Sequence, residues 1–244
     1  MSTTLEEPSV KTTEKKIEHL ESATVRFAGD SGDGMQLTGA QLTNTSALFG
    51  NDVATFPDFP AEIRAPKGTR AGVSGFQVQF ASTDIHTPGD KVDALVAMNP
   101  AALVTNIGDL RPGGILIVNE DNFVKKEFDL AKCDSNPLDD EEALSKYRVI
   151  RVPMTKLTRT AVEEVGLSTK EADRCKNFFS MGLIYWLYGR ELEATLRFIQ
   201  NKFGKKPEIA AANEKALRAG WYYGETTEAF GKCLPTGRRR VEVF

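Results

Sequence analysis

A predicted strand, a glycine-rich turn and a predicted helix follow one another without a break at residues 23–49. The alternating residues 23–29 predict the strand, and residues 34–49 predict a helix that ends at Gly50. The turn between them consists of small and acidic residues: Gly29, Asp30, Ser31, Gly32, Asp33 and Gly34. Glycine allows positive φ angles and lets another group approach the backbone closely. Such a unit predicts an α/β fold with this turn at the carboxyl edge of a parallel sheet.

The alternation of strand-like and helical segments continues along the chain. Further strands are predicted at residues 52–56, 73–82, 92–99, 115–119 and 148–153. A short helix at residues 100–107 joins two of them in a βαβ unit. The remainder is predicted to be helical, at residues 155–165, 170–188, 191–202 and 207–219. The sequence therefore predicts an α/β fold, a three-layer Rossmann-like domain with a mainly parallel sheet and a helical carboxyl-terminal portion.

The chain of 244 residues is long enough for one large domain, which we expect at residues 23–224. Residues 1–22 are polar, without a sustained apolar face, and are predicted to be a disordered leader. Residues 225–244 are predicted to be a linker-like tail. Residues 121–147 are polar and irregular, which predicts a surface excursion from the domain.

Net charge and hydropathy indicate whether the protein binds nucleic acid or a membrane. The formal net charge is −3, so the composition predicts no nucleic-acid partner. The sequence has no apolar run near the ~20 residues of a membrane span, and its first residues lack the apolar core of a secretory signal. We therefore expect a cytoplasmic protein that does not bind a membrane.

Residues that usually carry catalysis or metal binding are scarce. The three cysteines, Cys133, Cys175 and Cys233, are far apart and form no C-x-x-C pair. The two histidines, His19 and His86, lie in a polar leader and in a turn-like segment. The sequence therefore predicts no metal site and no catalytic residue in this chain, and any bond-breaking chemistry is expected in a partner.

The glycine-rich turn is suited to holding a phosphate, because backbone N–H groups at a helix start point at a bound anion. Its spacing is G-x-x-G-x-G, which differs from the dinucleotide fingerprint G-x-G-x-x-G, and only Asp52 or Asp58 weakly matches the acidic residue expected later. The sequence contains no Walker motif. A tight strand–helix turn that binds nothing remains an alternative.

Positive charge comes from a proline-rich segment after the second predicted strand. Arg64, Lys67 and Arg70 lie there, together with Thr69. Loops at the carboxyl ends of parallel strands line the binding crevice, so these cations are expected to face a phosphate held by the turn. A solvated basic loop without a ligand is the alternative.

Four segments carry the most specific pattern in the sequence. They are VRFAGDSGDGMQLTG at 25–39, FPDFPAEIRAPKGTRAGVSGFQVQFAS at 56–82, DALVAMNPAAL at 93–103 and RCKNFFSMGLIYWL at 174–187. In this order they resemble the gamma domain of 2-oxoacid:ferredoxin oxidoreductases, most closely the amino-terminal part of the 2-oxoglutarate-type alpha subunit. The last segment is similar to the helix that carries a Lys–Asn pair there. Lys176 and Asn177 then either belong to the site or only satisfy a neighbouring loop.

The resemblance implies a subunit or domain of a complex that oxidatively decarboxylates a 2-oxoacid, here 2-oxoglutarate, to acyl-coenzyme A. It implies that thiamine diphosphate and the iron–sulfur clusters are bound by partner subunits, that electrons pass to ferredoxin, and that this chain alone is inactive. It also implies a shared coenzyme A site. The residues expected there are Gly29, Ser31, Gly32, Asp33, Gly34, Arg64, Lys67, Thr69 and Arg70.

Several alternatives remain open at this level. In the alpha subunit that the chain resembles, a thiamine-associated domain follows, whereas this sequence ends at Phe244. A free-standing subunit, a truncated gene product and an excised domain are all compatible with that difference. A stand-alone Rossmann-like oxidoreductase using a nicotinamide or flavin, and a non-catalytic assembly domain, are the two other functions considered.

Overall fold

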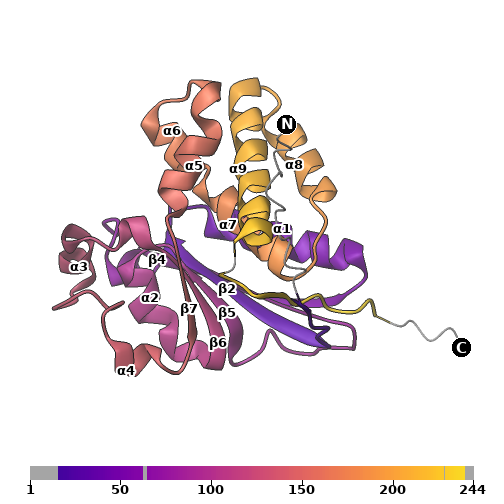
Figure 1. Ribbon diagram of the computed structural model, residues 1–244, viewed down its shortest axis with the longest axis horizontal. Helices are drawn as coiled ribbons and strands as arrows, with labels where there is room; N and C mark the ends of the chain where they lie inside the picture. Colours follow the sequence, from indigo (N-terminus) through magenta and orange to yellow (C-terminus); the bar gives the residue numbers. More distant parts are fainter. Residues whose placement is uncertain (1–15, 63–64, 228, 240–244) are drawn as a thin grey trace, which may run out of the picture.

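The computed structural model describes residues 16–62, 65–227 and 229–239. Within these residues the main element is a six-stranded sheet in the order β3-β4-β2-β5-β6-β7 (Figure 1). Its strands are β2 (Ser22–Asp30), β3 (Asp52–Asp58), β4 (Val73–Ala81), β5 (Val92–Ala97), β6 (Leu110–Asn119) and β7 (Arg148–Val152). β2, β5, β6 and β7 are parallel, and β4 runs antiparallel to both β2 and β3. The predicted mainly parallel sheet is confirmed.

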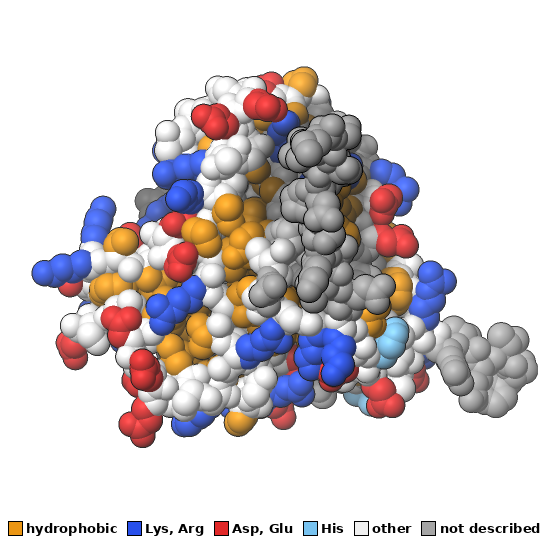
Figure 2. All heavy atoms as spheres, viewed as in Figure 1, with side chains coloured by type: hydrophobic (Ala, Val, Ile, Leu, Met, Phe, Trp, Pro, Cys, Tyr) orange, Lys and Arg blue, Asp and Glu red, His pale blue; other side chains and the backbone are white. Residues whose placement is uncertain are grey.

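Helices cover both faces of this sheet, which confirms the predicted layers (Figure 1). The helices are α1 (Met35–Phe49), α2 (Pro100–Asn106), α3 (Lys125–Ala131), α4 (Glu141–Leu144), α5 (Met154–Val162), α6 (Thr169–Arg174), α7 (Lys176–Leu187), α8 (Glu193–Phe203) and α9 (Pro207–Thr226). Short 3₁₀ turns lie at Arg70–Gly72, Ile107–Asp109, Glu120–Asn122 and Glu163–Val165. The face of the molecule seen in Figure 2 carries interspersed Lys, Arg, Asp and Glu side chains.

Alternating side chains of the central strands divide the core in two. In β5, Ala94 and Val96 pack into the cluster that contains residues of α1, α7 and α9, whereas Leu95 and Ala97 pack with α2. This alternation explains the continuous apolar sequence of the strand, because a central parallel strand is buried on both faces.

α7 and α9 approach each other closely through two glycines. A Cβ atom built on Gly182 would lie 2.0 Å from the Leu217 carbonyl oxygen, and one built on Gly220 would lie 1.9 Å from the Phe179 carbonyl oxygen. The two backbones therefore touch without intervening side chains. α7 is consequently buried along almost its whole length, from Asn177 to Leu187.

Several predicted boundaries differ from the structure. The helix predicted at 170–188 is two helices, α6 and α7, separated at Cys175. α9 continues to Thr226, because Leu217, Gly220 and Gly224 keep its buried face in contact with the domain beyond the predicted end at 219. The surface excursion at 121–147 contains α3 and α4, whose Ala131 and Leu144 are buried against the α2 side.

The described ends of the chain pack against each other. β1 (Lys16–Ile17) pairs in parallel with β8 (Lys232–Cys233), and Leu20 forms a bridge to Thr236. These residues fall in the expected leader and tail, and their pairing differs from a disordered leader and a linker-like tail. Two-residue strands are too short to leave a periodic pattern in the sequence. Residues 1–15 of the expected leader lie outside the described residues, and the division of the chain at 22 and 224 stays a prediction.

The buried guanidinium of Arg190 secures the tail. Its Nη2 donates to the Asn51 side-chain oxygen and to the Thr236 hydroxyl, both at 2.6 Å. The guanidinium lies 4.5 Å from the ring centroid of Phe49 and 4.7 Å from that of Phe80. Burial lowers the pKa of Arg190 to about 10, which leaves it charged at neutral pH.

Adding one methyl group at Gly220 tests the α7–α9 contact. Because the new Cβ would collide with the Phe179 carbonyl, we expect Gly220→Ala to cost about 1–3 kcal/mol and to lower Tm by about 2–12 °C. Gly108→Ala is the matched control, since a Cβ there meets no atom within 4 Å. Equal melting temperatures for both variants would contradict the close packing.

Candidate functional site

The glycine loop, residues 29–34, joins β2 to α1 at the carboxyl edge of the sheet. Gly34 is the N-cap of α1, with a φ of 78° that favours glycine. It has no side chain to cap the helix, and the first turn of α1 contains no acidic residue. The amino-terminal end of this 15-residue helix therefore has neither a side-chain cap nor an acidic residue in its first turn. Its backbone N–H groups are suited to binding an anion.

The Asp33 side chain is buried and shapes this loop from within. Its Oδ1 accepts a hydrogen bond from Lys176 Nζ at 2.8 Å, and its Oδ2 accepts one from the Asp30 backbone N at 3.2 Å. The sequence predicted Asp33 as a ligand-binding residue. In the structure its carboxylate pairs with Lys176, and Asp33 also lines the cavity beside the loop, so its predicted role in ligand binding stays a prediction.

Asp30 joins the glycine loop to the cation loop, which we define as residues 65–72. Its Oδ1 accepts a hydrogen bond from the Gly68 backbone N at 2.9 Å, and Gly68 has a φ of 80°. The Ser31 backbone N also donates to the Gly72 carbonyl oxygen at 3.3 Å. Burial raises the pKa of the Asp30 carboxyl, and the nearby charge of Asp33 raises it further.

The predicted cations have different positions. Lys67 is exposed and lies beside Gly32, where a built Cβ would be 3.5 Å from its Nζ. Arg70 instead donates to the carbonyl oxygens of Ala131 (2.8 Å) and Lys132 (3.1 Å) at the end of α3, which differs from the expectation that it faces the loop. The Thr69 hydroxyl donates to the Pro66 carbonyl within the cation loop itself.

Arg64 lies outside the described residues, so its predicted place in the site is untested by this structure. Gly29 lies at the base of the loop, where a built Cβ would be 3.1 Å from both Asp33 Oδ2 and Met98 Cβ. Gly29 therefore serves close packing beneath the loop. Lys67 is the predicted cation that the structure places against it.

The Lys–Asn pair singled out in the sequence contacts the glycine loop directly. Lys176 pairs with Asp33, and a Cβ on Gly34 would lie 2.5 Å from Asn177 Nδ2. The neighbouring loop that this pair satisfies is therefore the glycine loop, and a role of the pair in ligand binding stays a prediction. Gly34 is needed for its backbone conformation and for the space that Asn177 occupies.

A cavity of about 340 Å³ opens between the glycine loop and helices α6 to α9. Its apolar lining comes from Leu37, Phe178, Phe203 and Ile209, and two cations, Arg174 and Lys206, also line it. Sequence reasoning missed these cations, since they precede α7 and α9 and lie far from the loop along the chain. The cavity suits a long ligand with both anionic and apolar parts.

Cys175 also lines this cavity and is buried. Burial raises the pKa of its thiol to about 11, so the thiol is protonated at neutral pH and is a weak nucleophile. Besides the two cations, the carboxylate residues Asp33 and Glu171 also line the cavity. Among the described residues, no helix combines the length and apolarity that crossing a membrane requires.

The fold and site define an α/β domain with a glycine loop at the uncapped start of a helix, and comparison with known proteins identifies its family. Residues 24–223 match the family model of pyruvate ferredoxin/flavodoxin oxidoreductase. The chain belongs to this family, which confirms the family resemblance seen in the sequence.

The similarity extends to individual proteins. The chain is 59% identical over 230 residues to the 2-oxoglutarate oxidoreductase subunit KorA of Mycobacterium tuberculosis, covering 91% of this chain and 35% of that protein. Its fold matches a 2-oxoglutarate:ferredoxin oxidoreductase from Magnetococcus marinus with 2-oxoglutarate, coenzyme A and succinyl-CoA bound (TM-score 0.68, 22% identity, 91% of this chain, 34% of that one). It also matches a keto/oxoacid ferredoxin oxidoreductase gamma subunit from Geobacter sulfurreducens (TM-score 0.50, 20% identity, 82% of this chain, 99% of that one).

The chain thus spans about a third of the length of KorA but nearly the whole length of the Geobacter gamma subunit. The activity and partners of the longer relative are therefore a matter of proposal for this chain.

Breaking the Asp33–Lys176 pair tests whether it holds the loop. Because the two side chains are only 7% and 14% exposed, Lys176→Met would leave a buried carboxylate unpaired and cost about 3 kcal/mol in urea unfolding. Lys215→Met, which breaks the exposed pair with Glu164, should cost at most about 1 kcal/mol. The double variant Asp33→Asn/Lys176→Met should recover part of the loss, and additive effects would show that the pair is uncoupled.

The raised pKa of Asp30 predicts a pH dependence of stability. The native state binds more protons than the unfolded chain between the ordinary value of 3.8 and the raised value, so the contribution of Asp30 to stability falls as pH rises through this window. Asn can still accept the Gly68 hydrogen bond but does not titrate. The free energy of unfolding of Asp30→Asn, relative to the wild type, should therefore increase from about pH 4 upward. If the free energies of unfolding of the wild type and Asp30→Asn, measured in urea, changed with pH in the same way, the raised pKa of Asp30 would be contradicted.

Proposed function

We propose that this chain is the gamma-type part of a 2-oxoglutarate:ferredoxin oxidoreductase, and that its glycine loop binds coenzyme A. The observation that carries the proposal is the ammonium of Lys67 beside Gly32, at the uncapped start of α1. The 59% identity to KorA supports 2-oxoglutarate as the substrate of the whole enzyme. The coenzyme A bound in the Magnetococcus enzyme supports the choice of ligand.

The residues present fit the chemistry of coenzyme A. This coenzyme joins a diphosphate and a 3′-phosphate to a long pantetheine arm, so it needs cations, backbone donors and an apolar channel. Lys67, Arg174 and Lys206 provide positive charge, and the start of α1 provides backbone donors. The cavity beside the loop provides the apolar surface through Phe178 and Phe203. Another polypeptide is proposed to complete the site.

Companion chains are proposed to supply the redox chemistry. Thiamine diphosphate and iron–sulfur clusters would be bound there, with ferredoxin as the electron acceptor. In this chain Cys133, Cys175 and Cys233 lie in three separate parts of the fold, which supports that division of labour. The role of this chain is to bind and orient the thiol substrate, and we expect it in the cytoplasm and inactive on its own.

A nicotinamide-binding enzyme is the rival function. It would need an acidic side chain after the second strand that is free to bind the ribose hydroxyls. Asp58 pairs with Arg26 at 2.6 Å, and Asp52 accepts a hydrogen bond from the Ile85 backbone N at 2.9 Å. Both candidates are engaged within the chain, which favours coenzyme A.

The experiment uses calorimetry with coenzyme A on the assembled enzyme. Gly32→Val is the sharpest variant, because a Cβ at Gly32 meets Lys67 only at an ordinary contact distance, so the fold should survive while the ligand is excluded. Gly34→Val is less useful, since it collides with Asn177 even without a ligand. We expect Gly32→Val to abolish coenzyme A binding and leave Tm unchanged.

Lys67→Ala and Arg70→Ala form a matched pair from the same loop. Loss of a charge-assisted hydrogen bond should make Lys67→Ala bind coenzyme A more weakly by about 1.5–3 kcal/mol, and less so at high salt. Arg70→Ala should leave binding nearly unchanged and lower stability, because Arg70 contacts α3. Preferential binding of NAD would favour the nicotinamide rival. Assembly without any coenzyme binding would favour a purely structural domain.

A further inference from the structure

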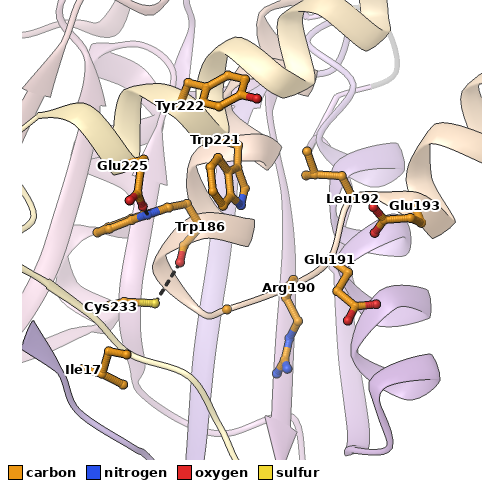
Figure 3. Close-up of a pocket in the computed structure, with 11 residues that line it drawn as sticks. Ile17, Trp186, Arg190, Glu191, Leu192, Glu193, Trp221, Tyr222, Glu225 and Cys233 are labelled. Atoms are coloured by element: carbon orange, nitrogen blue, oxygen red, sulfur yellow. Dashed lines mark hydrogen bonds between the residues drawn. The ribbon is translucent and has the colours of Figure 1, made fainter. Parts of the chain in front are cut away.

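A second, larger hollow of about 820 Å³ lies at the opposite end of α7 from the glycine loop (Figure 3). We call it the acidic groove. It runs between β1, β8, α9 and the segment joining α7 to α8. Its lining residues are Ile17, Trp186, Gly189, Arg190, Glu191, Leu192, Glu193, Trp221, Tyr222, Glu225 and Cys233.

Aromatic side chains form one wall of the acidic groove. Trp221 and Tyr222 meet edge to face with ring centroids 5.4 Å apart, and Trp186 lies below them and donates its indole N–H to Glu225 at 2.5 Å. Tyr222 is 57% exposed, and Ile17 on the other side is 64% exposed. Apolar side chains of this size, left open on two sides of one groove, are typical of an interaction surface.

The charge of the acidic groove is negative where it meets solvent. Glu191, Glu193 and Glu225 are exposed. Arg190 is the one cation lining the groove in the described chain, and its guanidinium is buried against Asn51 and Thr236. Figure 3 shows its side chain extending away from Trp221 and Tyr222.

Two of these three glutamates, Glu191 and Glu193, also line a smaller hollow, together with Arg197 and Arg238. The ion pairs formed by the described residues do not include either glutamate. Their carboxylates are therefore available to an incoming cation. A cationic side chain over aromatic rings and between carboxylates gains both Coulombic and cation–π attraction.

We propose that the acidic groove docks a segment of a companion polypeptide that carries Lys or Arg beside an aromatic or aliphatic side chain. This inference rests on the proposed function, because the companion is the thiamine-diphosphate-bearing polypeptide of the same oxidoreductase. Charge complementarity selects a basic segment. A polypeptide is favoured over a small organic cation, because a small ligand would leave Ile17 and Tyr222 on opposite sides of the groove exposed.

The acidic groove is separate from the glycine loop but shares α7 with it. Asn177 contacts the loop at one end of this helix and Trp186 lines the groove at the other, about 14 Å apart along the helix axis. Groove variants therefore leave the residues proposed to bind coenzyme A untouched. The docking surface and the ligand site can be tested independently in one complex.

The two tryptophans of the chain, Trp186 and Trp221, both line the groove and report on it directly. The full chain is labelled with 5-fluorotryptophan and titrated with the unlabelled companion polypeptide, and the ¹⁹F signals are assigned with Trp221→Phe. We expect the Trp221 signal to shift on binding. Glu191→Lys/Glu193→Lys should raise Kd at least tenfold, and added salt should raise the wild-type Kd.

The control variant is Glu141→Lys/Glu142→Lys. It makes the same change of charge at exposed glutamates in the first turn of α4. Its Kd should stay within twofold of the wild type. Equal Kd values for the two double variants, or an unshifted Trp221 signal on binding, would overturn the docking proposal.

Other occupants give different results, each of which also overturns the proposal. If a second copy fills the groove, the free wild type self-associates in sedimentation and Glu191→Lys/Glu193→Lys abolishes this. If residues 1–15 fill it, their removal shifts the Trp221 signal of the free chain. Should docking fail while coenzyme A binding still depends on Gly32 and Lys67, the proposed function stands. Should the wild type bind neither companion nor coenzyme, both proposals fail.

Discussion

The ion pair between Asp33 and Lys176 ties the turn after β2 to the first turn of α7. Both side chains are largely buried, so removing either one would leave the charge of the other buried without a partner. The pair sets the position of Asn177 over Gly34, and with it the wall of the cavity beside the loop. α7 packs tightly against α9 through Gly182 and Gly220. The position of the glycine loop, which Lys176 fixes to α7, therefore depends on the packing of these two helices.

The two aspartates of the glycine loop explain how an acidic turn can serve an anion. Both carboxylates have partners within the chain: Asp33 pairs with Lys176, and Asp30 accepts the Gly68 N–H and fixes the loop that carries Lys67. Their negative charge is used to hold lysine-bearing segments in place. The uncapped start of α1 and Lys67 are left for the anion that we propose.

The site was only partly predictable from the sequence. The glycine spacing at residues 29–34 indicated the turn, and the later Lys176–Asn177 pair was singled out by resemblance. Arg70 and Lys67 look equivalent in the sequence, yet Arg70 binds the carbonyl end of α3 while Lys67 faces the loop. Arg174 and Lys206 were not predicted as cations of the site, because only the packing of α6 and α9 against the loop brings them to the cavity.

The sequence by itself determined the six strands of the main sheet, the longer helices in outline and the layered class of the fold. Apolar runs such as residues 92–97 must be buried on both faces, and a strand ending in closely spaced glycines must turn into the next helix. Only the tertiary structure decided where Asp33 and Arg70 point, how far α9 extends, and that the two ends of the domain pair through β1 and β8. Those outcomes depend on contacts between residues up to more than 200 positions apart, as between Lys16 and Lys232. Local periodicity carries no record of such contacts, because they are formed by the packing of whole elements.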